Sequence, residues 1–217
     1  MAGTRRVSRQ REAGEATRRE TRRKVLVAAR LEFAERGYAA ATVNRIAERA
    51  DVAVQTLYHA WGSKRELLRA VMETAVTGED EVGVQASVLP VPLLSGLDPD
   101  DAADPKKLLA HLVHSFRLLA ERAASAWLTY RDAAGVDPDV AADWQQLMEI
   151  RRSNFRVLID RIPARRLRPG LTKAVAADTA WVIASPDSYD QLVRGAGYSL
   201  DELEKWVFNT LCAVLLR

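Results

Sequence analysis

Residues 42–64 contain short polar side chains of the kind that form hydrogen bonds with the edges of DNA bases. Gln55, Thr56 and His59 stand between the apolar residues of a helical segment, and none of them helps to build a hydrophobic core. Gln55 and His59 are about one helical turn apart, so their side chains face the same strip. Donors and acceptors near the start of a helix are what reading a major groove requires. This pattern predicts a helix that recognises a DNA sequence.

Further positions of this stretch are predicted to contact the DNA backbone. Thr42 and Arg45 belong to the preceding helix, and Tyr58 can reach a phosphate with its hydroxyl. Lys64 begins the next helix, where free amide groups and the helix dipole favour a phosphate. Contacts with phosphates set position and affinity, whereas contacts with base edges set sequence choice. Tyr58 could instead be a core aromatic, and His59 could be a solvated surface residue.

Two short helices and a tight turn must position this strip. The first helix has apolar residues at the i, i+3, i+4 and i+7 spacing of an amphipathic helix, which are Val43, Ile46, Ala47 and Ala50. Thr42 is placed to be its N-cap, because its hydroxyl can accept a hydrogen bond from a free backbone amide. The pattern breaks at Asp51, and a second apolar face includes Leu57 and Trp61, so we expect Trp61 in the core. This arrangement is a helix-turn-helix.

The stretch from about Thr21 to Met72 resembles the N-terminal domain of the tetracycline-repressor-like (TetR) family of bacterial regulators. The C-terminal part resembles one branch of that family, through WVIASPDSYDQLVRGAGYSLDELEKW at 181–206. The resemblance implies a DNA-binding regulator of transcription, and in this family mostly a repressor. The N-terminal matches are AARLEFAERGY at 28–38, TVNRIAERA at 42–50, TLYHAW at 56–61 and SKRELL at 63–68.

The sequence departs from the family pattern at two positions near the turn. Asp51 stands where the family usually has a glycine, and aspartate is among the few other residues that tolerate a positive φ. Ala53 stands where a serine or threonine usually caps the recognition helix, and a methyl group cannot accept a hydrogen bond. We expect the helix-turn-helix to tolerate both changes.

The chain of 217 residues has a net charge of +3 that conceals an asymmetry. Residues 1–72 contain 16 Lys and Arg against 8 Asp and Glu, a net charge of +8, whereas the remainder has a net charge of −5. A basic third joined to an acidic remainder is typical of a nucleic-acid-binding module attached to a domain with another role, with a solvated basic tail as the alternative. Residues 1–17 are rich in arginine, and we predict a disordered arm that enters a minor groove or anchors phosphates.

Periodicity and capping residues predict an all-α fold with a three-helix helix-turn-helix domain at the N-terminus and a larger helical domain after it. Asp104, Asp137 and Ser185 each place a capping side chain before a proline, and Ser63 and Ser199 begin capping boxes. The predicted organisation is a disordered basic arm at 1–17, the helix-turn-helix domain at 18–62, a connecting helix at 63–76, a loop at 77–104 and a helical domain at 105–217. Helices of the last domain are predicted near 105–120, 123–134, 138–161, 173–184, 186–194 and 200–216.

The family resemblance implies that the domain at 105–217 binds a small-molecule effector and forms a homodimer. Its last long helices, 173–184 and 200–216, would form the dimer interface. A symmetric dimer would place two recognition helices about one DNA turn apart, so its double-stranded operator should be a near-palindrome. Bulky apolar residues suit a mostly apolar ligand pocket, although such residues at helical spacing are more often plain core. The candidate pocket residues are Phe116, Trp127, Tyr130, Trp144, Met148, Phe155 and Trp181.

Other classes of function find little support in the residues. No phosphate-binding glycine loop, nucleophile elbow or carboxylate pair indicates an enzyme, and nothing indicates a cofactor. His111 and His114 are spaced for a metal pair, but no further ligands complete a site. No apolar run approaches the roughly 20 residues of a membrane helix, and the single Cys212 excludes an internal disulfide, so a cytoplasmic location is expected. The alternatives are a dimeric DNA-binding protein without a small-molecule ligand, or a helical enzyme.

Overall fold

The computed structural model describes residues 2–78, 98 and 103–217. Within these residues the backbone is helical, and the one extended pairing is an isolated antiparallel bridge between Leu167 and Leu216. The predicted all-α fold is therefore confirmed. In the described part of the chain, no helix is both long enough and apolar enough to cross a bilayer. The chain divides into two compact units, which are Met1–Ala86 with Thr129–Ala141 (unit 1) and Ser87–Leu128 with Ala142–Arg217 (unit 2).

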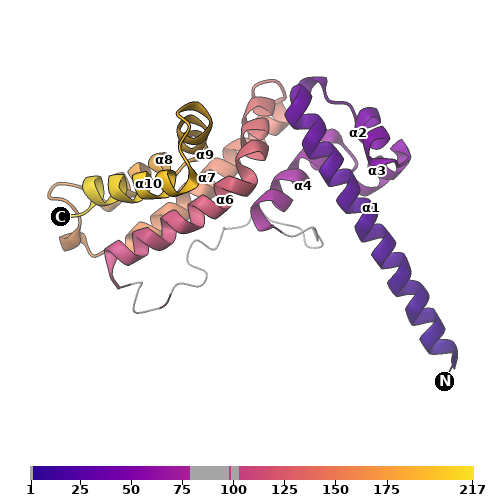
Figure 1. Ribbon diagram of the computed structural model, residues 1–217, viewed down its shortest axis with the longest axis horizontal. Helices are drawn as coiled ribbons and strands as arrows, with labels where there is room; N and C mark the ends of the chain where they lie inside the picture. Colours follow the sequence, from indigo (N-terminus) through magenta and orange to yellow (C-terminus); the bar gives the residue numbers. More distant parts are fainter. Residues whose placement is uncertain (1, 79–97, 99–102) are drawn as a thin grey trace. The chain divides into compact units, whose positions relative to one another are not determined.

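Unit 1 is built on its first helix. The helices α2 and α4 pack against α1, and α3 packs against α2 and α4 (Figure 1). Apolar residues from all of these helices form the core, among them Phe33, Ile46, Leu57, Leu67 and Leu68. The helices are α1 (Ala2–Ala40), α2 (Val43–Ala50), α3 (Val54–Trp61) and α4 (Lys64–Thr77).

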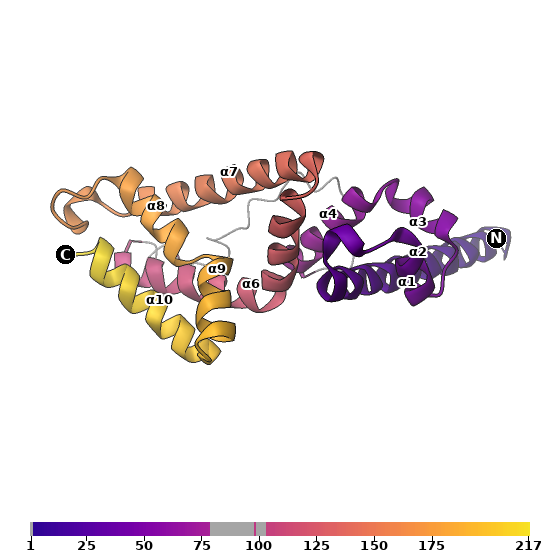
Figure 2. The same cartoon turned by 90° about the horizontal axis from the view of Figure 1, so that it is seen from above.

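Unit 2 gathers the long helices of the C-terminal part around one core. Leu108, Leu112, Ile159, Leu203 and Val207 are fully buried members of this core, and α8 and α10 pack against each other (Figure 2). The last turns of α6 and the first turn of α7 belong to unit 1. The helices are α6 (Pro105–Ala134), α7 (Pro138–Asp160), α8 (Lys173–Ile183), α9 (Pro186–Tyr189) and α10 (Leu200–Leu215), with a 3₁₀ turn at Ala164–Arg166 and a π-helical turn at Asp190–Gly195.

The predicted capping residues start their helices. Asp104 Oδ1 accepts a hydrogen bond from the amide of Lys106 at 2.9 Å, at the start of α6. Ser185 accepts one from the amide of Ser188 at 3.1 Å. Ser199 and Glu202 form a complete capping box at the start of α10. These side chains satisfy amide groups that a helix leaves free at its N-terminus.

Some predicted boundaries are wrong. Residues 2–17 were expected to be disordered, but they are the first part of α1, because alanine, arginine, glutamate and glutamine favour extension of a helix that is already anchored in a core. The predicted break at 121–122 is absent, since Glu121 and Arg122 are good helix formers and no proline or glycine interrupts α6. The helix predicted at 186–194 leaves the α conformation at Asp190 and continues as the π turn. The loop predicted at 77–104 lies outside the described residues except at its two ends and at residue 98.

Candidate nucleic-acid interface

The turn between α2 and α3 has the backbone conformation that its sequence required. Thr42 Oγ1 accepts a hydrogen bond from the amide of Arg45 at 3.3 Å and so caps α2. Asp51 has a φ of 55° and is the only residue other than glycine with a positive φ in the described chain. Ala53 is the N-cap of α3 and makes no side-chain capping bond. The unusual aspartate is therefore accommodated in the left-handed region, and α3 begins without a cap.

The helix α3 exposes the strip that was predicted to read DNA. Gln55, Thr56 and His59 are exposed, while Leu57 is buried beneath them. The Tyr58 side chain is 52% exposed, which excludes the alternative that it is a core aromatic. Short side chains that carry hydrogen-bond donors and acceptors thus lie together on the outer face of α3, where they are accessible to base edges.

Trp61, at the end of α3, is half-buried, as a partial core role requires. The guanidinium carbon of Arg22 lies 5.2 Å from the centre of its indole ring, within the range of a cation–π contact. Burial lowers the pKa of Arg22. The contact attaches the end of the recognition helix to α1.

The residues predicted to contact phosphates differ in whether their side chains are exposed or already bound within the protein. Thr42 and Arg45 are exposed. Lys64, by contrast, donates hydrogen bonds from Nζ to the carbonyl oxygens of Tyr38 at 2.8 Å and Ala41 at 3.2 Å. Its ammonium also lies 4.1 Å from the centre of the Tyr38 ring, and burial lowers its pKa. Lys64 therefore joins the start of α4 to the end of α1, and its role as a phosphate ligand stays a prediction.

A buried carboxylate fixes α2 against α1. Glu32 is 2% exposed, and its oxygens lie 3.0 Å from Nε of Arg36 and 3.5 Å from Nη2 of Arg49. Arg49 also donates two hydrogen bonds to the exposed carboxylate of Glu35, at 2.8 and 2.5 Å. Because Arg49 is in the last turn of α2, this network holds the helix that supports the recognition helix.

A second contact, which no local sequence pattern indicates, joins α1 to the loop between α6 and α7. The hydroxyl of Tyr38 donates to Oδ2 of Asp137 at 3.0 Å, while Oδ1 of Asp137 accepts from the amides of Asp139 and Val140 at 3.0 and 3.3 Å. The hydrogen bond from Tyr38 lowers the pKa of Asp137, and burial raises the pKa of Tyr38. The favourable contribution of Asp137 is thus present at neutral pH and lost as the pH falls below about 4.

The comparisons with known proteins agree with this geometry. Residues 25–71 match the sequence model described as bacterial regulatory proteins, tetR family. The N-terminal domain is that of the TetR family. The match covers α2, α3 and the first part of α4 up to Val71, together with the last part of α1. No curated protein matches the chain.

Solved structures extend the likeness of fold beyond the TetR domain. NalD of Pseudomonas aeruginosa, described as the secondary repressor of the MexAB-OprM multidrug efflux pump, has 19% identity and a TM-score of 0.68, with 91% of this chain and 98% of NalD covered. SmeT in complex with triclosan has 21% identity and a TM-score of 0.66, with 91% and 92% covered. A transcriptional regulator from Rhodococcus sp. RHA1 has 17% identity and a TM-score of 0.65, with 89% and 95% covered. Both units therefore have the fold of TetR-family regulators.

The residues predicted for a ligand pocket are distributed over both units of this TetR-like fold. Tyr130 belongs to unit 1, and the other six belong to unit 2. Trp127 and Trp144 are in edge-to-face contact, with ring centres 4.9 Å apart. Trp127, Phe155 and Trp181 surround the guanidinium of Arg151, which the sequence analysis did not consider. Phe116, Trp127, Tyr130 and Phe155 are buried, whereas Trp144, Met148 and Trp181 are half-buried.

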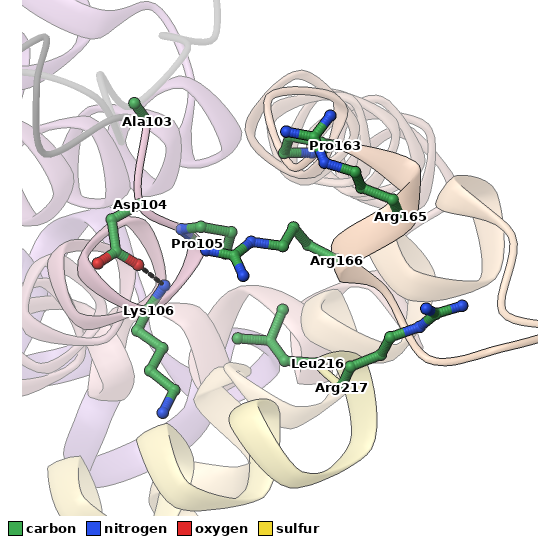
Figure 3. Close-up of a pocket in the computed structure, with 9 residues that line it drawn as sticks. All are labelled: Ala103, Asp104, Pro105, Lys106, Pro163, Arg165, Arg166, Leu216 and Arg217. Atoms are coloured by element: carbon green, nitrogen blue, oxygen red, sulfur yellow. Dashed lines mark hydrogen bonds between the residues drawn. The ribbon is translucent and has the colours of Figure 1, made fainter.

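An open cleft of about 840 Å³ lies elsewhere in unit 2, and none of the predicted pocket residues lines it. Its cations are the exposed side chains of Lys106, Arg165, Arg166 and Arg217. Figure 3 shows the side chain of Arg166 extending toward Pro105, while that of Arg217 points the other way. This cleft is cationic and open to water, unlike an apolar effector pocket.

Replacing the buried Glu32 tests the support of α2. We expect Glu32→Ala to lower the free energy of unfolding by about 1–3 kcal/mol, because it leaves two arginines without their shared buried partner. Glu35→Ala is the matched control, since it removes an exposed carboxylate from the same Arg49 and should cost less than about 1 kcal/mol. Chemical denaturation followed by circular dichroism measures both. Equal losses for the two variants would show that burial of Glu32 is not what stabilises the domain.

Lys64→Met separates the two roles of that lysine. We expect the variant to be less stable and to bind all DNA more weakly, with an unchanged dependence of affinity on salt, because its ammonium is already bound to carbonyl groups. Arg45→Ala should instead reduce the slope of log K against log salt by about 0.9, the loss of one phosphate contact. Fluorescence anisotropy at several salt concentrations measures the slopes. A reduction for Lys64→Met equal to that for Arg45→Ala would restore Lys64 as a phosphate ligand.

Proposed function

We propose that this protein is a sequence-specific transcriptional regulator that represses by occupying a near-palindromic operator and is released by a small molecule. The observation that carries the proposal is the exposed strip of Gln55, Thr56 and His59 above the buried Leu57. A polar strip held outward by its own hydrophobic support is the arrangement of a recognition helix. The net charge of +8 over residues 1–72 supports the same function, because it attracts the phosphate backbone.

The proposed binding form is a symmetric homodimer. Val175 and Val182 on α8 are 53% and 58% exposed, and Trp206 on α10 is 37% exposed. Leu203, Val207 and Leu211 cover the inner face of α10 with no exposure, so α10 presents an aromatic residue outward while it is anchored inward. Exposed apolar side chains on two packed helices favour burial against a second copy. Such a dimer would present two recognition helices to the two halves of one operator.

A small-molecule effector is the proposed signal. NalD is described as a repressor of an efflux pump, and SmeT was solved with triclosan bound. The aromatic side chains of unit 2 supply the large contact surfaces that small-molecule sites use. The effector would release the protein from DNA by favouring a dimer geometry that no longer matches the spacing of the half-sites.

Substitutions on the strip test sequence recognition. We expect Gln55→Ala and His59→Ala each to weaken binding to the operator by about 5- to 100-fold, equivalent to about 1–3 kcal/mol, and to leave binding to an unrelated duplex unchanged. Footprinting on the DNA upstream of the gene locates the operator, and anisotropy titrations give both affinities. Gln146→Ala, at an exposed residue of α7 outside the proposed dimer interface, is the control that should alter neither. An equal loss on both duplexes would contradict base reading by this strip.

A charge placed on α8 tests the dimer. We expect Val182→Glu to convert the dimer to a monomer, because a carboxylate would be buried in an apolar interface. Val136→Glu is the matched control, since Val136 is 63% exposed in the loop after α6 and outside the proposed interface. Light scattering after size-exclusion chromatography gives the mass of each variant. A monomeric wild type, or a Val182→Glu variant that stays dimeric, would overturn the proposed interface.

A further inference from the structure

An arginine stands at the centre of the aromatic cluster of unit 2. The guanidinium carbon of Arg151 lies 5.0 Å from the ring centre of Phe155, 5.5 Å from that of Trp181 and 5.7 Å from that of Trp127. Burial lowers the pKa of Arg151 to about 10, and Asp187 opposes this effect through space. A guanidinium so placed keeps its charge at neutral pH, in surroundings that are mostly apolar.

The hydrogen bonds of the Arg151 guanidinium to the protein use only some of its N–H donors. Nη2 of Arg151 donates to the carbonyl oxygens of Trp181 at 2.8 Å and Ala184 at 2.5 Å. These carbonyls belong to the C-terminal end of α8, where the helix dipole favours a positive charge. A guanidinium has five N–H donors, and both of these bonds use Nη2. The two backbone carbonyls and the aromatic rings are in contact with the guanidinium, and Asp187 acts on it through space.

Two further donors in the same cluster are buried without an acceptor. Nε1 of Trp127 and Nε1 of Trp181 are inaccessible to solvent and have no hydrogen-bond partner among the described residues. The indole nitrogen is a donor only, and buried donors are rarely left without an acceptor in proteins. The cluster thus contains a cation and two indole donors without an acceptor, all of which require acceptor atoms.

The cluster is open to the surface and lies beside an irregular segment. Trp144, Met148 and Trp181 are half-buried, so these three residues are partly exposed to solvent. Directly after α9 the chain forms the π turn at Asp190–Gly195. π-Helical turns are rare and occur often at functional sites. Leu192 and Val193 of this turn pack against the same core as Trp181.

We propose that Trp127, Arg151 and Trp181 form the effector site, and that the effector is a small carboxylate with a flat apolar body. The carboxylate would accept hydrogen bonds from Arg151 and from the indole donors, and the apolar body would lie against the rings. The role of this ligand as an effector rests on the proposed function. Binding of the carboxylate does not, because it is measured without DNA. The mostly apolar ligand expected from the sequence would thus carry one anionic group.

The test compares benzoate and 2-naphthoate with their neutral carboxamides, by calorimetric titration of the full-length protein. We expect at least one carboxylate to bind at least 10-fold more tightly than its amide. Arg151→Met should abolish that preference, and Arg151→Lys should keep part of it. The matched control is Arg152→Met, because Arg152 is the exposed neighbour that pairs with Asp178 at 2.6 Å and should not affect binding.

Three further variants keep the test decisive. If Arg151→Met does not fold, Trp127→Phe and Trp181→Phe remove one indole donor each and should weaken the carboxylate severalfold more than the amide. Arg166→Met removes a cation from the open cleft, the other cationic site of unit 2, and should leave binding unchanged.

Several results would overturn the proposal. These are no preference for any carboxylate, a preference that survives in a folded Arg151→Met variant, and a loss caused by Arg166→Met instead. Operator binding is measured separately with the same preparations. Failure to bind DNA would therefore contradict the proposed function and leave the carboxylate site standing, whereas loss of the anion preference alone would contradict this site only.

Discussion

Helix α3 is only eight residues long, and isolated helices of this length are marginal in water. Its outer face must stay in solvent to meet DNA, so Leu57 is the single residue of α3 that is fully buried in the structure. The conformation of the recognition helix therefore depends on groups behind it. Asp51 in the left-handed region sets its direction, and α2, whose Ile46, Ala47 and Ala50 are buried, packs against it. The Glu32 carboxylate and Arg49 then hold α2 to α1.

Much of this support could be predicted from the sequence because it is local. Caps such as Thr42 and Ser199 act over three residues, and the apolar spacing of α2 lies within eight. Tyr38 and Asp137 are 99 positions apart, and no local pattern indicates that such residues meet. The engagement of Lys64 by the end of α1 is likewise a tertiary contact. The exposed strip could be predicted. Whether each cationic side chain near it is exposed or already bound within the protein could not.

Arg151 shows a different limit of the sequence reading. Trp144, Met148, Arg151 and Phe155 follow the i, i+4, i+7, i+11 spacing of a single helical face. The signal for a charged residue within the aromatic face was therefore present. The candidate pocket residues were bulky apolar side chains, so they included the neighbours of Arg151 but not Arg151 itself. An ionisable residue on an apolar face is expensive unless it is paired, so its position carries more information about function than the aromatic residues do.

The same two helices connect this arginine to the recognition domain along the chain. Trp127 lies on α6 and Arg151 on α7, and the loop between these helices carries Asp137, which both caps α7 and accepts the hydrogen bond of Tyr38. A ligand shifts an equilibrium only by its difference in affinity for the two states, and couplings between sites are typically about 1–3 kcal/mol. One hydrogen bond contributes about 0.5–1.5 kcal/mol. The hydrogen bond between Tyr38 and Asp137 is therefore comparable in size to a typical coupling.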